Sequence, residues 1–146
     1  PYRILVSGRT KHYTSAFGEH VIAFEVEESM KATIEKFPAQ ITEFHLAPQV
    51  TPKEGLPYHE WFIEFEKEPE DLEGFKAMLN QEMRNRNSYY NDLISGHILQ
   101  NLIITRLQKN AFNEYAKSEG KLGGQNKIPR LANDRKIASI LEGYTL

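Results

Sequence analysis

Two polar, glycine-bearing stretches, residues 8–19 and residues 120–130, hold the side chains best suited to chemistry in this sequence. Each stretch lies between segments with regular hydrophobic patterns. Loops that a rigid frame holds in place carry a large share of the binding and catalytic residues of proteins. We therefore expect any site in this chain to be built from these two loops.

The second stretch has the composition of an anion-binding loop. Its three glycines let the backbone approach a ligand closely, and Lys121, Lys127 and Arg130 supply positive charge. A lysine on a flexible stem can reach a neighbouring site and neutralise a phosphate or a developing oxyanion. The Gly-x-x-x-x-Gly-Lys-Ser/Thr pattern of a P-loop is missing, so spacing alone leaves open whether the loop binds an anion or is only solvated.

Several other chemistries are disfavoured. The chain has no cysteine, which removes disulfides, thiolate metal sites and cysteine nucleophiles. Its five histidines are scattered. His45 and His59 could meet across a pair of strands, but a zinc site needs three or four ligands, so we expect no metal site. No Gly-x-Ser-x-Gly elbow supports a serine nucleophile.

Charge and hydropathy limit the partners. The net charge is −2 and the densest charge run, residues 64–73, is acidic, whereas nucleic-acid-binding proteins usually carry a basic surface. No apolar run approaches the roughly 20 residues that span a bilayer, and the first residues do not resemble a signal peptide. We expect a cytoplasmic protein that binds neither nucleic acid nor membrane. The chain begins without Met, as if inside a strand, which suggests a piece of a longer protein.

The hydrophobic periodicity predicts one α+β domain over residues 1–146, with helices packed on a small mixed or antiparallel sheet. Residues 88–99 are ambiguous between a short helix and a turn. The other expected elements are a strand at 3–7, a helix at 24–37, an antiparallel pair of strands at 41–50 and 58–66, a helix that Pro69 opens, a strand at 102–107, and two short helices capped by Asn110 and Asn133.

The first stretch resembles the hinge motif of the adenylate-forming enzyme superfamily. Gly8-Arg9-Thr10-Lys11 is followed by Phe17-Gly18-Glu19-His20-Val21-Ile22 and then by Glu25-Val26-Glu27. This order is similar to the superfamily's Gly-Arg-x-Asp/Lys, Gly-x-x-Ile/Val and Glu-Ile/Val-Glu elements.

Two further segments narrow the resemblance. Residues 58–66 and residues 120–131, the latter followed by Asn133-Asp134-Arg135, resemble the C-terminal domain of the auxin-responsive acyl acid–amido synthetase family, especially its bacterial members. The resemblance extends from Ile4 to about Leu141.

The resemblance implies an activity for a larger protein. Such enzymes use ATP and Mg²⁺ to convert a carboxylic acid into an acyl-adenylate, and then transfer the acyl group to an amine or amino acid. A large N-terminal adenylating domain binds most of the ATP and the acyl acid, and a small C-terminal domain swings about a hinge. The present chain matches only that small cap domain, with residues 8–19 as the hinge and adjoining loop, and we expect it to be inactive alone.

The resemblance also implies roles for single residues. Lys127 is expected to be catalytic, bridging the acyl carboxylate and the α-phosphate, although the Pro-x-x-x-x-Gly-Lys pattern that usually precedes the superfamily's lysine is absent. Arg9 and Arg130 are expected at the nucleotide, and Lys11 at the hinge. The channel for the acceptor amine is expected to be lined by Phe17, Gly18 and Glu19.

A second interpretation is a non-catalytic α+β module that binds a protein or a small molecule. Composition and periodicity do not distinguish this module from the cap domain of a ligase. A large adenylating domain encoded upstream would favour the cap domain of a ligase.

Overall fold

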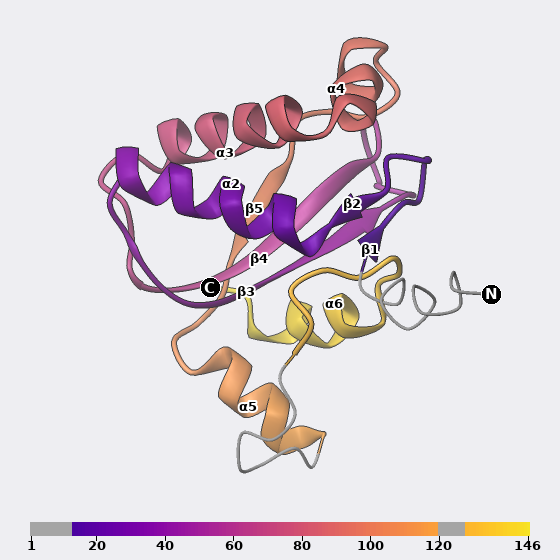
Figure 1. Ribbon diagram of the computed structural model, residues 1–146. Helices are drawn as coiled ribbons and strands as arrows, with labels where there is room; N and C mark the ends of the chain where they lie inside the picture. Colours follow the sequence, from indigo (N-terminus) through magenta and orange to yellow (C-terminus); the bar gives the residue numbers. More distant parts are fainter. Residues whose placement is uncertain (1–12, 120–127) are drawn as a thin grey trace, which may run out of the picture.

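The computed structural model describes residues 13–119 and 128–146 (Figure 1). The predicted strand at 3–7 lies outside these residues. In chain order the elements are β1 (Tyr13–Thr14), β2 (Val21–Ile22), α2 (Ala23–Lys36), β3 (Gln40–Gln49), β4 (Tyr58–Lys67), α3 (Leu72–Arg86), α4 (Ser88–Ser95), β5 (Ile103–Arg106), α5 (Ala111–Ser118), α6 (Lys136–Leu141) and the 3-10 helix η2 (Glu142–Tyr144).

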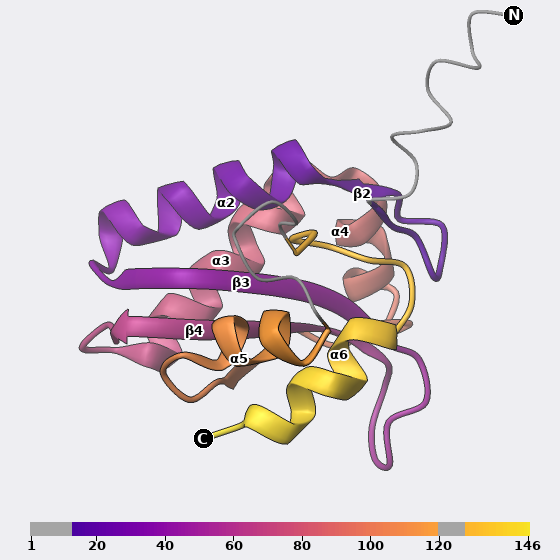
Figure 2. The ribbon, with the colours of Figure 1, turned by 90° about the horizontal axis from the view of Figure 1, so that it is seen from below.

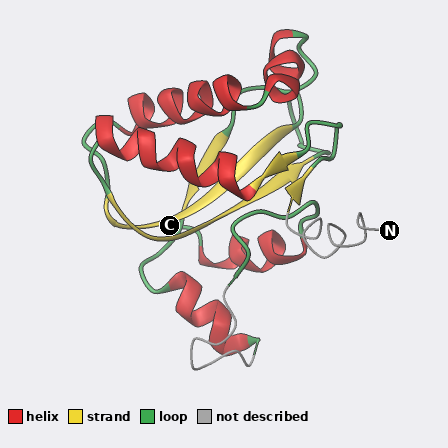
Figure 3. Ribbon diagram, in the orientation of Figure 1, coloured by secondary structure: helices red, strands yellow, loops and turns green. Residues whose placement is uncertain are grey.

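The main sheet has the order β3-β4-β5. Strands β3 and β4 are antiparallel, and β4 and β5 are parallel, so the predicted small mixed sheet and the α+β class are confirmed. Helices α2 and α3 cover one face, whereas α5 and α6 lie on the other (Figures 1 and 2). Strands β1 and β2 form a separate antiparallel pair at the N-terminal end of α2 (Figure 3).

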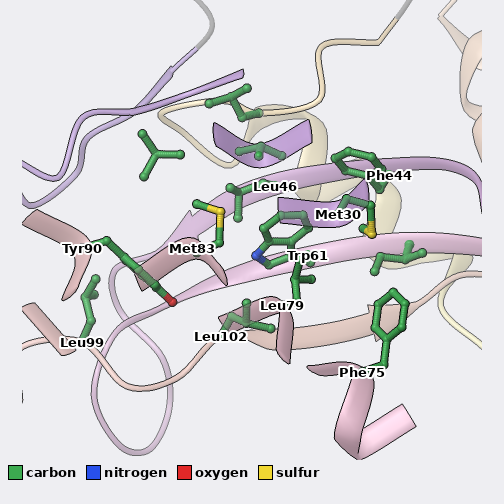
Figure 4. Close-up of a cluster of buried hydrophobic side chains, with 14 of the residues drawn as sticks. Met30, Phe44, Leu46, Trp61, Phe75, Leu79, Met83, Tyr90, Leu99 and Leu102 are labelled. Carbon is green, nitrogen blue, oxygen red and sulfur yellow. The ribbon is translucent and has the colours of Figure 1, made fainter. Parts of the chain in front are cut away.

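Strand β4 is central and buried on both faces. Trp61, Ile63 and Phe65 pack into the cluster beneath α2 and α3, and Phe62 packs on the opposite side with α5 and α6. Figure 4 shows Trp61 among Met30 and other side chains of the first cluster. Fully burying one large apolar side chain stabilises a fold by about 1.5–3 kcal/mol, so β4 requires cover on both sides.

The start of α3 differs from the prediction that Pro69 opens this helix. The helix begins at Leu72, after the N-cap residue Asp71, whose carboxylate accepts a hydrogen bond from the N–H of Gly74 at 2.9 Å. Pro69 therefore lies before the helix. An aspartate at the N-cap satisfies a free N–H and favours the positive end of the helix dipole.

The cap of α5 also differs from the prediction. Asn110 precedes the helix, but it adopts a left-handed conformation with φ of 75° and its side chain makes no capping bond. The buried carboxylate of Glu64, on β4, instead accepts hydrogen bonds from the N–H groups of Asn110 at 2.7 Å and Phe112 at 3.0 Å. The first residue of the acidic run at 64–73 is thus the cap of a helix far along the sequence.

Asn133 was likewise predicted to cap the last helix, which is wrong. Helix α6 begins at Lys136, and the residue at its N-cap is Arg135. The side-chain oxygen of Asn133 accepts a hydrogen bond from the N–H of Ser15 at 2.7 Å. Asn133 therefore joins two distant parts of the chain.

Replacing Glu64 by Gln should destabilise the domain. Glutamine has one carbonyl oxygen for two N–H donors and presents an amide to the second, so we expect a loss of about 1–2 kcal/mol. Urea unfolding of this chain measures it, with Glu66→Gln as the control on the same strand. Glu66 forms an exposed ion pair with Lys109, which should contribute little. Equal effects of the two substitutions would contradict the capping role of Glu64.

Candidate functional site

The turn between β1 and β2 lies beside the segment that follows the second polar loop. The hydroxyl of Thr14 donates to the carbonyl of Ala132 at 2.7 Å, and Asn133 accepts from the N–H of Ser15. The parts of the two stretches that the structure describes, 13–19 and 128–130, therefore belong to one region of the surface. This region is the candidate site.

The turn is fastened from inside by Glu19. This carboxylate is fully buried, lies 2.5 Å from Nε2 of His59 on β4, and accepts the N–H of Phe17 at 2.8 Å. Gly18 beside it has φ of 88°, a left-handed conformation that glycine adopts without strain. The side chain of Glu19 thus points into its own domain, while Gly18 is exposed.

Two opposing effects set the ionisation of Glu19. Burial, the largest single influence, acts to raise the pKa of this carboxyl, but the hydrogen bond and charge of His59 and the backbone N–H groups together hold the pKa below its ordinary value of 4.5. A buried carboxylate is tolerated when such partners satisfy it. Glu19 is therefore an ionised anchor of the turn at neutral pH.

A network of polar groups continues from this anchor into the core. The ring of His59 stacks on Tyr90 of α4, with centroids 4.9 Å apart, and the Tyr90 hydroxyl donates to Asn80 of α3 at 2.7 Å. The side-chain amide of Asn87 donates to the carbonyl of Glu19 at 2.9 Å and caps α4 by accepting from the N–H of Tyr90. The orientation of the turn is thus tied to β4, α3 and α4.

The segment after the second loop is attached to the free edge of β3. The N–H of Leu46 donates to the carbonyl of Arg130 at 2.8 Å, and the N–H of Ala132 donates to the carbonyl of Leu46 at 3.0 Å, which forms a parallel bridge between Leu46 and Leu131. The side chain of His45 bonds the carbonyl of Pro129 at 2.7 Å. Three backbone groups, the carbonyls of Pro129 and Arg130 and the N–H of Ala132, are therefore bonded to β3.

Arg130 lies in a pocket between α2 and β3. Its Nε donates to Glu43 at 2.9 Å, and its Nη1 lies 3.5 Å from a carboxylate oxygen of Glu27. The guanidinium also covers the ring of Phe44, 4.8 Å from its centroid, and the Arg130 side chain is 40% exposed. Two carboxylates partly offset the charge, but five N–H donors leave the guanidinium able to contact a further anion.

The structure describes part of the site predicted from the sequence. Phe17, Gly18 and Glu19 lie on the β1–β2 turn, and Arg130 lies on the neighbouring segment. Arg9, Lys11 and Lys127 fall outside the described residues.

The possible meeting of His45 and His59 is ruled out. His45 is opposite Phe62 in the β3–β4 register, and His59 is opposite Pro48, so the two rings lie on opposite faces of the sheet. Each ring instead fastens one of the two loops. The sequence shows only the parity of each histidine along its strand, whereas these roles depend on the register of the two strands, which tertiary packing sets.

Within residues 13–119 and 128–146, no group of three or more histidine, aspartate or glutamate side chains is arranged to hold a metal ion. In the same part of the chain, no helix has the length and apolar character required to cross a bilayer.

Replacing Glu19 by Gln should change both stability and its pH dependence. At neutral pH we expect a loss of about 1–3 kcal/mol, because the buried hydrogen bonds to a charged group are replaced. Since the pKa of Glu19 is lowered in the folded state, its contribution is present above the ordinary carboxyl range and disappears as the pH falls through the folded-state value.

The difference in free energy of unfolding between the wild type and Glu19→Gln should therefore become smaller as the pH is lowered. Thermal unfolding between neutral and acidic pH measures this, with the exposed Glu35→Gln on α2 as control. A difference in stability that stayed constant down to strongly acidic pH would contradict the conclusion that Glu19 is ionised and holds the turn.

Comparisons with known proteins agree with this fold. The family model described as the GH3 family C-terminal domain matches residues 19–136. A solved structure of "GH3.15 acyl acid amido synthetase" has a TM-score of 0.75 at 14% identity, over 93% of this chain and 26% of that chain. Another, "AtGH3.15 acyl acid amido synthetase in complex with 2,4-DB", has a TM-score of 0.72 at 14% identity, over 94% and 26%.

This chain thus spans about a quarter of the length of these solved proteins. A search of curated protein sequences gives no match. The family model covers most of the chain, from the buried Glu19 to the first residue of α6. On this evidence, the chain belongs to the GH3 family and is its C-terminal domain.

Proposed function

We propose that this chain is the cap domain of an ATP-dependent ligase that joins a carboxylic acid to an amine or amino acid. In the first half-reaction, a carboxylate oxygen attacks the α-phosphorus of ATP and pyrophosphate leaves. In the second, the amine attacks the acyl carbon and AMP leaves. Membership of the family supports this proposal, and so does the proximity of the two polar segments in one surface region.

The partner of this domain would be an N-terminal adenylating domain of the same protein. That domain would bind the acyl acid, most of the ATP and the Mg²⁺. The solved relatives are about four times longer than this chain, which leaves room for such a domain. A mobile cap that closes over an acyl-adenylate excludes water and prevents hydrolysis of the intermediate.

The cationic side chains of the two polar stretches have separate proposed roles. Lys127 would bridge the acyl carboxylate and the α-phosphate during adenylation, and Arg9 would contact the nucleotide. Arg130 would orient the loop through Glu43 and place its remaining N–H donors toward a phosphate. The planar guanidinium of Arg130 suits both tasks, because it can bind a carboxylate along one edge and a phosphate along another.

The β1–β2 turn would act in the second half-reaction. Lys11 would lie at the hinge, and the turn would line the channel for the amine. Because the side chain of Glu19 is turned into the domain, its contribution would be to hold the turn, whereas Phe17 and Gly18 would contact the amine's path.

Lys127→Ala in the full-length protein should lower ATP–pyrophosphate exchange by roughly 100-fold or more, the effect of losing one preorganised charge at a developing anion. The assay would use a panel of carboxylic acids and run beside residues 1–146 alone, which should be inactive. Lys121→Ala is the matched control in the same loop. Unchanged pyrophosphate exchange in Lys127→Ala would refute the catalytic role of Lys127. Activity of residues 1–146 alone would refute the proposal that this chain is a cap domain that needs its partner domain.

Gly18→Ala should separate the two half-reactions. A Cβ at Gly18 meets no described atom within 4 Å, so the substitution changes only the backbone preference at φ of 88°, at a cost of about 1–2 kcal/mol. We expect near-normal pyrophosphate exchange and amide formation slowed by up to roughly tenfold. Gly143→Ala, in open space without a positive φ, is the control. Equal slowing of both half-reactions would exclude a role confined to the acceptor channel.

A further inference from the structure

His45 is a buried histidine for which the described residues supply a hydrogen-bond partner at one ring nitrogen only. It lies on β3 and is fully buried on the face covered by α5 and α6. Its Nδ1 lies 2.7 Å from the carbonyl oxygen of Pro129. Since a carbonyl can only accept, Nδ1 carries the proton. The other nitrogen, Nε2, is buried and has no partner among the described residues.

This arrangement favours a neutral imidazole. Protonation would place a charge and a second N–H in a buried position where no described group accepts it, which is costly. Burial, the largest influence, accordingly lowers the pKa of His45 from its ordinary value of 6.5. The charged groups that face the ring are Asp134 and Arg135, on the segment leading into α6, and Glu43 on β3 itself.

The carbonyl that His45 holds is at a particular place in the chain. Proline has no N–H, so this carbonyl is the only backbone hydrogen-bonding group of Pro129. The next backbone contact to β3 is made by Arg130, through Leu46. The bond from His45 is therefore the first described hydrogen bond to the sheet after Lys127, which precedes Pro129 by two residues in the sequence.

We propose that His45 is a positioning residue for adenylation: its Nδ1–H fixes the carbonyl of Pro129 on β3, and so holds in one place the segment 128–132 that follows Lys127 in the sequence. The consequence for catalysis depends on the proposed ligase function. The attachment of Pro129 to the sheet does not, and it can be tested separately. His45 contacts no substrate in this proposal and acts through the segment 128–132.

Three variants of the full-length protein separate this role from simple stabilisation. His45→Asn places an amide N–H close to the position of Nδ1 and removes the titrating ring. His45→Leu fills the site without a donor. Leu141→Ala removes a fully buried side chain from the hydrophobic cluster on the same face of the sheet but keeps the hydrogen-bond donor of His45 to Pro129, and it serves as the control for lost stability.

The first readout is ATP–pyrophosphate exchange as a function of pH. We expect His45→Leu to lower kcat by roughly ten- to a hundredfold at all pH values, as for a catalytic group displaced by about 1 Å, with a small change in KM for ATP. His45→Asn should keep most of the wild-type kcat at neutral pH. Because asparagine does not titrate, kcat of this variant should fall less steeply at acidic pH than kcat of the wild type. Leu141→Ala should keep both kcat and the pH profile.

The second readout is amide hydrogen exchange at Ala132, whose N–H is bonded to Leu46. Protection should be kept in His45→Asn and reduced in His45→Leu. If the wild-type protein showed no pyrophosphate exchange with any acid, the proposed ligase function would be refuted. Hydrogen exchange at Ala132 would still show whether His45 holds Pro129 on β3. The proposal is overturned if His45→Leu keeps its protection at Ala132, or if it matches His45→Asn in kcat and in pH profile.

Discussion

The burial of β4 on both faces is the constraint on which the rest of this domain depends. Its side chains alternate between two hydrophobic clusters, and each needs a layer of helices. The layer above comes from α2 and α3, which flank the strands in sequence. The layer below comes from α5 and α6, in the C-terminal part of the chain. Residues 130–132, which precede α6, lie along the edge of β3, and Ala132 and Asn133 contact the β1–β2 turn.

Buried polar groups fix the details that the hydrophobic clusters leave free. Glu64 supplies the cap of α5, Glu19 and His59 hold the β1–β2 turn, and His45 holds Pro129. Each group would be costly to bury without its partner. Such groups stabilise little compared with the apolar clusters, but they allow only one placement of the segment they bind. The fold thus specifies its loops through a few buried hydrogen bonds.

The sequence was sufficient for the architecture and insufficient for these bonds. Period-two alternation identified β3 and β4, and the helical stripe of Val26 and Met30 identified α2, because both patterns follow from burial on one face or two. The start of α3 was predicted at Pro69, whereas the helix begins after the N-cap Asp71, because both residues favour a helix start. Nothing local indicates that Glu64 caps a helix 46 residues away in sequence, or on which face His45 lies, because the register is set by tertiary packing. The two polar stretches were visible as candidates, but the contact of Thr14 with Ala132 depends on the whole fold.

The segment 129–132 also protects the edge of the sheet. An open strand edge offers unpaired N–H and carbonyl groups to any other strand and promotes aggregation. Here Leu46 has both of its outward backbone groups bonded to this segment, and Arg130 places a charged side chain over the neighbouring Phe44. A large movement of the loop stem would uncover that edge. If the proposed ligase function holds, solubility and catalysis would both favour this attachment, and the segment 129–132 would move with β3 as part of one rigid body.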